Sequence, residues 1–316
     1  MDCGSERKDL ILYGLDPGAY EHPLDSKALN SLEGTPGLEN LLRKINEYGV
    51  ELFLKTQYTG SNIKVTSQMF PEIHNILVHV CETVHLKPVP DLYITQDPVI
   101  NAFTVGSENP IIVLNAKTVE CLTEKELQFI IGHEVGHIKS QHVLYHMLAA
   151  IILPSIGDFV GKVTLGIGGL LTDSLQLALL TWQRKSEFTS DRAGLLACQD
   201  RDAAITAFMK IAGAPESHYN NLDPEKFLAQ AREFKGFDES NWKAIIKFVS
   251  VLGSTHPWTV VRCAELDKWI VSGEYQRLLD TYGRERKDVE VVCGNCGNKL
   301  INGARFCGNC GLKVPE

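Results

Sequence analysis

The spacing of apolar residues changes along the chain and predicts helices followed by a small sheet. Residues 36–55 and 67–86 place apolar side chains three and four positions apart, which predicts two amphipathic helices joined by a turn. The next block contains short segments rich in β-branched or aromatic residues, "DLYITQD", "NAFTVGS" and "PIIVLNA", which predict strands. Residues 1–36 are polar and interrupted by prolines, so we expect an extended arm or a set of turns there.

A longer helix is predicted after the sheet. Thr123, with Glu126 three residues on, forms a capping box, and no breaker interrupts the helical pattern before Pro154. The segment "FIIGHEVGHIKSQH", residues 129–142, therefore lies on this helix. It contains the spacing H-E-x-x-H, which is typical of a metal site.

The H-E-x-x-H residues are His133, Glu134 and His137. Residues four apart project from the same helical face, so both histidines can turn a ring nitrogen toward one zinc ion. Glu134 lies beside that point, where a carboxylate can take a proton from a metal-bound water. The alternative interpretation is a buried helix that carries two histidines for packing reasons.

A catalytic zinc needs a third protein ligand and one open position. A third histidine six residues after His137 is excluded, because Ser140 and Val143 occupy the required Gly and His positions. The segment "RKSEFTSDRAG" instead offers Glu187 and Asp191, four apart on one helical face. Glu187 would bind the metal, and Asp191 would accept the free ring N–H of a ligand histidine. The alternative is a solvated acidic pair.

Two further histidines lie near these motifs. His142 is one residue out of register for a third ligand, and we interpret it as a supporting or surface residue. His256 precedes Pro257 at a junction from loop to helix, since proline suits a first helical turn. A histidine there can hydrogen-bond the oxyanion of a tetrahedral intermediate, although a structural role is the alternative.

Taken together, these motifs resemble a known family in their order and spacing. The segments "NAFTVG", "HEVGH", "RKSEFTSDRAG" and "STHPWTVVR" are similar to those of the zinc metallopeptidases that include the heat-shock protease HtpX, the CAAX prenyl proteases and the mitochondrial inner-membrane stress peptidases. The resemblance covers roughly residues 38–279. It implies an α+β fold, a mainly helical gluzincin metallopeptidase domain with a small sheet beside the cleft.

The resemblance also implies roles for particular residues. The implied zinc ligands are His133, His137 and Glu187, with Glu134 as general base. Asp191 and Arg262 would support the site, and His256 would act on the substrate. A substrate peptide would pair as an added strand with the segment Asn101, Ala102 and Phe103.

The C-terminal cysteines predict a second zinc site. Two C-x-x-C knuckles ten residues apart supply four thiolates, from Cys293, Cys296, Cys307 and Cys310. About 25 residues could hardly fold without a metal, so this zinc is expected to be structural. Disulfides or a redox dithiol are the alternative, and the lack of a secretion signal argues against them. We interpret the five scattered cysteines as buried thiols.

These observations predict four regions along the chain. They are an N-terminal arm at 1–36, a zinc metallopeptidase domain at 37–282, a linker at 283–292 and a zinc ribbon at 293–316.

Composition and charge restrict location and partners. A chain of 316 residues with 44% hydrophobic composition can bury a substantial core, and its net charge of −8 argues against nucleic acid as the principal partner. The N-terminus has no apolar stretch typical of a signal peptide. Residues 147–182 are apolar but broken by charges, so we expect helices that cap the cleft and no membrane span, although some family members span the membrane here. A cytoplasmic location is expected, with peripheral membrane contact through this segment as an option.

The sequence therefore predicts a zinc metalloendopeptidase that cuts protein or peptide substrates with a zinc-activated water. One Zn²⁺ would be catalytic and one structural. The alternative is an interaction protein that uses the peptidase fold as a scaffold and the ribbon to bind partners. The intact Glu134 argues against that alternative, because a scaffold does not need a general base. The sequence indicates neither the physiological substrate nor the oligomeric state.

Overall fold

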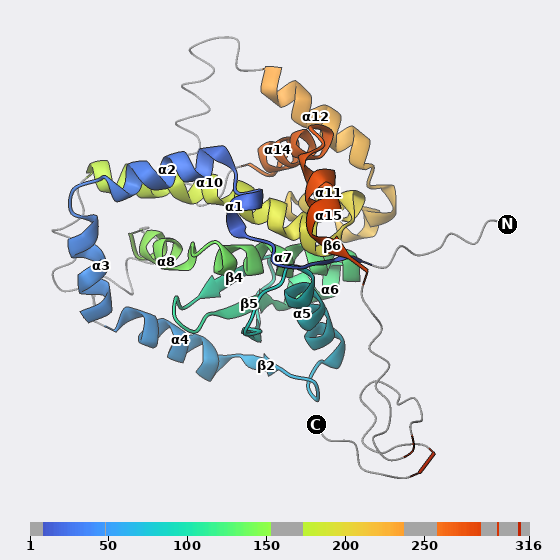
Figure 1. Cartoon of the computed structure of the whole chain (residues 1–316), viewed down its shortest axis with the longest axis horizontal. Coiled ribbons are helices and arrows are strands. Elements are labelled where there is room, and N and C mark those ends of the chain that lie inside the picture. Colours follow the sequence, from blue (N-terminus) through green and yellow to red (C-terminus); the bar gives the residue numbers. More distant parts are fainter. Residues whose placement is uncertain are drawn as a thin grey trace. The chain divides into compact units, whose positions relative to one another are not determined.

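The computed structural model describes residues 9–47, 49–152, 173–236 and 258–285, together with Cys296, Asn309 and Cys310. Residues 9–284 form one unit. Its elements are mostly helices, with two small sheets (Figure 1). The predicted α+β class is confirmed. The ribbon lies almost wholly outside the described residues and stays a prediction.

The larger sheet has four strands in the order β2-β3-β5-β4. Its strands are β2 (Ile63–Val65), β3 (Asp91–Thr95), β4 (Ala102–Val105) and β5 (Ile111–Asn115). β3 and β5 are parallel, while β2 and β4 pair antiparallel with their neighbours. The three predicted strands are confirmed, and of this sheet only the three-residue β2 was missed. Within the described residues β4 forms one edge of the sheet.

Helices make up most of the unit. After residue 36 they are α3 (Leu38–Glu47), α4 (Val50–Ser61), α5 (Pro71–Thr83), α6 (Ala116–Cys121), α7 (Glu124–Lys139), α8 (Val143–Ile152), α10 (Asp173–Cys198), α11 (Arg201–Ile211), the 3-10 helix η2 (Glu216–Asn221), α12 (Pro224–Gly236), α14 (Thr259–Val271) and α15 (Glu274–Tyr282). The first predicted helix is divided into α3 and α4, because Gly49 adopts a left-handed φ of 61°. Among the helices described here, none combines the length and apolar character needed to cross a membrane.

The N-terminal segment differs from the extended arm that its prolines predicted. It contains helices α1 (Pro17–Tyr20) and α2 (Pro23–Glu33), and Pro17 and Pro23 each stand in a first helical turn, where the missing N–H costs nothing. α2 lies along α10 (Figure 1). Ahead of them, β1 (Ile11–Leu12) pairs antiparallel with β6 (Gly283–Arg284). The prolines therefore start helices that pack on the rest of the unit.

Helix α7 begins as predicted and ends earlier. The capping box of Thr123 and Glu126 is confirmed, but the helix stops at Lys139 instead of continuing to Pro154. Gln141 adopts a φ of 59°, and the N–H of His142 donates to the carbonyl of His137 at 2.9 Å, the bond of a Schellman motif. Glycine usually occupies the left-handed position of this motif, so a glutamine there does not signal a helix end. The chain then turns back into α8.

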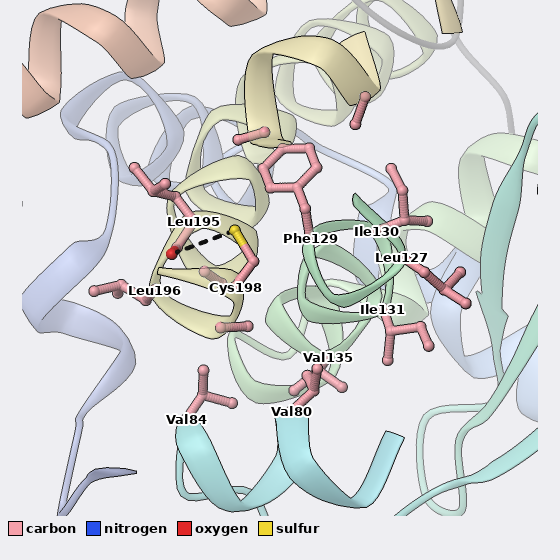
Figure 2. Packing of buried hydrophobic residues seen from close by; sticks show 14 of the residues in the cluster. Val80, Val84, Leu127, Phe129, Ile130, Ile131, Val135, Leu195, Leu196 and Cys198 are labelled. Carbon is pink, nitrogen blue, oxygen red and sulfur yellow. Dashed lines mark hydrogen bonds between the residues drawn. The ribbon is translucent and has the colours of Figure 1, made fainter. Parts of the chain in front are cut away.

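Helices α7 and α10 pack unusually close together. A Cβ at Gly136 would lie 2.6 Å from the Cβ of Ala193, and Gly132 and Gly194 face similar contacts. Figure 2 shows apolar side chains of the two helices in one cluster, among them Phe129 of α7 and Leu195 and Cys198 of α10. The close packing brings the H-E-x-x-H turn of α7 against the turn of α10 that carries the predicted third ligand.

Replacing Gly136 with alanine should therefore destabilise the protein. The added methyl must push α7 and α10 apart, and we expect the free energy of unfolding to fall by about 1–3 kcal/mol, measured by urea denaturation. Gly60→Ala in α4 is the control, because a Cβ added at Gly60 would have no atom within 4 Å and the φ there is not left-handed. In the control, the free energy of unfolding should stay the same or rise by up to about 1 kcal/mol. Equal effects of the two substitutions would contradict the role of close helix packing.

Candidate metal centre

Three buried side chains bring their ligand atoms together between α7 and α10. The Nε2 atoms of His133 and His137 lie 3.1 Å apart. Glu187 Oε2 lies 3.5 Å from His133 Nε2, and its Oε1 lies 3.4 Å from His137 Nε2. A tetrahedral zinc with bonds of about 2.0–2.1 Å holds its ligand atoms about 3.3 Å apart. Two imidazoles and a carboxylate at these separations fit a zinc ion. Among the described residues, His133, His137 and Glu187 are the group of His, Cys, Asp or Glu side chains whose donor atoms lie this close together.

Asp191 and Arg262 support these donors from one side. Asp191 Oδ1 accepts a hydrogen bond from His133 Nδ1 at 3.0 Å, which leaves His133 Nε2 to face the metal position. Arg262, on α14, donates from Nε to Asp191 Oδ2 at 2.9 Å. Its Nη1 also lies 3.3 Å from Glu187 Oε2. One buried arginine thus holds both carboxylates that α10 contributes.

Burial and neighbouring charges shift the pKa values of these side chains in different directions. Burial acts to raise the pKa of Asp191, but Arg262 and His133 outweigh it and the pKa is lowered. Burial acts to lower the pKa of His133, while Asp191 and Glu187 raise it above its usual value. Burial and the neighbouring histidines lower the pKa of His137 to about 3. His137 is therefore neutral near pH 7, the state that binds a metal.

Glu134 lies next to the donors and is held by the sheet. Thr104 Oγ1, on β4, donates to Glu134 Oε2 at 2.7 Å. Burial raises the pKa of Glu134, although His133 and Thr104 act against this shift. No role for Thr104 was predicted from the sequence. Its side chain is uncharged, and it stands in a strand segment that was predicted to pair with the substrate. The predicted substrate residues lie on the same segment, with Asn101 just before β4 and Ala102 and Phe103 within it.

His142 was predicted to be a supporting or a surface residue, and the structure excludes the surface position. It is 3% exposed, and its Nδ1 lies 3.2 Å from Nδ1 of His137, one of the predicted ligands. The ring of His146, on α8, also packs against His137, and its Nε2 lies 2.7 Å from Ser186 Oγ. Both contacts depend on the turn that ends α7, which has no signature in the sequence.

Several predicted residues lie outside the described chain. They are His256, Cys293 and Cys307, and most of the apolar segment, residues 153–172. Cys296 and Cys310 are described and exposed, but their partners in the ribbon are not. Four of the scattered cysteines are buried free thiols as expected: Cys81, Cys121, Cys198 and Cys263.

Comparison with known families agrees with this geometry. Residues 67–270 match the model of Peptidase family M48. The chain belongs to peptidase family M48. Members of this family are zinc metallopeptidases, so the protein is a hydrolase that acts on peptide bonds, and the resemblance noted from the motifs is confirmed.

Relatives from plants, archaea and bacteria support the M48 assignment. The chain is 31% identical to the "Plastoglobule-localized metallopeptidase 48, chloroplastic" of Arabidopsis thaliana over 278 residues, which cover 87% of this chain and 79% of the relative. It is 24% identical to "Protease HtpX homolog 2" of Methanosarcina acetivorans, over 76% of this chain and 88% of that protein. A "Protease HtpX homolog" of Helicobacter pylori is 26% identical over 66% of this chain and 70% of its own. No solved structure matches the chain.

Proposed function

We propose that the protein is a zinc-dependent metalloendopeptidase in which His133, His137 and Glu187 hold the catalytic zinc. The observation that supports this most strongly is the mutual spacing of the three donor atoms, 3.1 to 3.5 Å, in a buried site. Two histidines and a glutamate are a donor set that catalytic zinc sites use. The family assignment supports the same metal.

Glu134 is proposed as the general base. When bound, zinc lowers the pKa of a water molecule and polarises the carbonyl of the scissile peptide. Glu134 takes a proton from the attacking water and later delivers it to the leaving amine. Thr104 fixes the orientation of Glu134 through its hydrogen bond, and burial raises the carboxyl pKa toward the range in which it can both accept and return a proton. No covalent intermediate is needed.

The substrate peptide is proposed to pair with β4. This strand is an edge of the sheet within the described residues, and Thr104 connects it directly to the general base. An extended peptide added beside the segment of Asn101, Ala102 and Phe103 would make main-chain hydrogen bonds. Its scissile bond would then pass beside Glu134.

The remaining sequence predictions are kept as proposals. We propose His256 as a group that hydrogen-bonds the oxyanion, and a zinc ribbon at 293–316 that holds a structural Zn²⁺ and recruits protein partners or substrates. The predicted metallopeptidase domain limits of 37–282 are narrower than the unit of residues 9–284, and the linker stays a prediction only beyond Arg284. Peripheral membrane contact of a cytoplasmic protein through residues 147–182 also stays a prediction. Protein or peptide substrates are the expected ligands of the metallopeptidase domain.

Incubation with casein tests the proposed activity. The purified protein should cleave casein, and a zinc chelator such as 1,10-phenanthroline should abolish this activity. Adding zinc back should restore it, because the metal activates the attacking water and polarises the substrate carbonyl. Gel electrophoresis follows the cleavage. Cleavage that continues unchanged in the zinc-depleted protein would contradict a zinc peptidase. Cleavage of neither casein nor a peptide library by the zinc-loaded protein would favour a scaffold.

A further inference from the structure

A chain of buried hydrogen-bonding groups runs from α10 through α2 to the ligand His137. Thr189 Oγ1, on α10, donates to Asp25 Oδ2 at 2.5 Å. The same Asp25 oxygen lies 3.2 Å from His142 Nε2. His142 Nδ1 in turn lies 3.2 Å from Nδ1 of His137. Thr189 and Asp25 are 0% exposed and His142 is 3% exposed, so water does not compete for these contacts.

The positions of the protons along this chain follow from its two ends. His137 turns Nε2 toward His133 and Glu187, so its proton must be on Nδ1 when Nε2 binds a metal. That N–H needs an acceptor, and the atom it meets is His142 Nδ1. His142 must then carry its own proton on Nε2, where the Asp25 carboxylate accepts it. Every donor in the chain therefore meets an acceptor.

The two ligand histidines are thus supported in different ways. His133 reaches its carboxylate, Asp191, directly. His137 reaches Asp25 only through the ring of His142. A carboxylate behind a ligand histidine fixes the ring orientation and makes the imidazole a stronger ligand. Asp25 would perform this role for His137 indirectly, through the ring of His142.

We propose that Asp25 and His142 are positioning residues that fix the tautomer and orientation of His137, so that helix α2 completes the metal site. This inference depends on the proposed function, since it assigns a role behind one of the proposed zinc ligands. It also gives the packing of the N-terminal segment on α10 a role in the metal site. The carboxylate that supports His137 comes from α2, far from the motif in the sequence.

Contacts around Asp25 and His142 hold both residues in place. The backbone N–H of His22 donates to Thr189 Oγ1 at 3.1 Å, and Arg192 Nη1 donates to the carbonyls of Tyr20 and Glu21 at 3.1 and 3.0 Å. These bonds attach the start of α2 to α10. His142 is fixed by the turn that ends α7 and by edge contact with the ring of Trp182, with centroids 5.5 Å apart.

Zinc affinity tests the proposal without depending on activity. We expect Asp25→Leu and His142→Leu each to weaken zinc binding by about 10–100-fold, as loss of a supporting group behind a ligand histidine does. Glu72→Leu, a carboxylate-to-leucine substitution at an exposed position of α5, should bind zinc like the wild type. Zinc retained at graded concentrations of a competing chelator gives the affinity, and a ribbon zinc would contribute equally to all four proteins. Wild-type affinity in both test variants would overturn the proposal.

Nitrogen NMR of the zinc-loaded wild type gives a second test that needs no variant. The ¹⁵N shifts and couplings of the histidine rings distinguish Nδ1–H from Nε2–H, and we expect the His142 proton on Nε2 and none on Nδ1. A proton on Nδ1 of His142 would overturn the proposal even if the variants fail to fold. Failure of the proposed function would be seen separately, as a wild-type protein that holds no zinc through His133, His137 and Glu187.

Discussion

Replacing Glu134 with glutamine is expected to lower kcat for casein hydrolysis by about 10²–10⁴-fold, the usual contribution of a general base. The amide has nearly the same shape and can still accept a hydrogen bond from Thr104, but it cannot take a proton from water. Because Glu134 is not one of the three proposed ligands, zinc content should remain that of the wild type. The rate of casein cleavage and elemental analysis of zinc together check the prediction.

A glutamate on the same helix provides the control for this substitution. Glu124, in the first turn of α7, is exposed and far from the donors, so Glu124→Gln should retain kcat. Full activity in Glu134→Gln would refute the assignment of the general base. Loss of zinc from Glu134→Gln would show instead that Glu134 belongs to the ligand set.

The substitution Glu187→Gln is expected to remove the catalytic zinc. The amide keeps the volume of the side chain but loses the negative charge, and neutral amides are not among the usual zinc ligands. Since changes behind the ligands already weaken binding by about 10–100-fold, loss of a ligand should weaken it by more than about 100-fold. Arg262 keeps its two hydrogen bonds to Asp191, so the fold should survive. Zinc content and thermal denaturation check both parts of the prediction.

An exposed glutamate serves as the control for the ligand substitution. The side chain of Glu120, on α6, is 66% exposed, and Glu120→Gln should keep both zinc and activity. A Glu187→Gln protein that unfolds would leave the zinc result ambiguous, so Glu187→Asp provides a second variant. It keeps the charge but shortens the reach of the carboxylate, and it should recover part of the zinc that Glu187→Gln loses.

Much of the site could be predicted from the sequence because its main residues lie on regular helices. Residues four apart share a helical face, so the spacing of His133 and His137 and that of Glu187 and Asp191 each predicted one ligand face. The structure packs the two faces together through Gly136 and the small residues opposite it. The spacing within each motif does not show that the two helices pack together. The expectation that His133, His137 and Glu187 form one site came from the family resemblance.

The contacts of Thr104, Asp25 and His142 could not be predicted, because they depend on how separate segments pack. Thr104 is an uncharged residue of a strand, and only the position of β4 beside α7 gives it Glu134 as a partner. Asp25 lies in a polar, proline-containing segment that was predicted to form an extended arm or turns. It is nevertheless fully buried beside His142. His142 was expected to continue a helix, whereas the left-handed residue Gln141 turns it back toward His137. Local patterns do not record such contacts.

The predicted elements were most accurate where the apolar periodicity was strong. They were least accurate where the conformation of a single residue ends a helix. The three predicted strands and the start of α7 follow their patterns. The breaks at Gly49 and Gln141 depend on left-handed backbone conformations at single residues. Gly49 was available as a signal in the sequence, but Gln141 was not, because glutamine is rare in that conformation.

Elemental analysis of zinc in the wild type and in Glu187→Gln decides whether the metal centre exists. The wild type should hold one more zinc per chain than the variant, because His133, His137 and Glu187 are proposed to bind the catalytic ion together. Equal zinc content in two folded proteins would contradict a metal centre between α7 and α10.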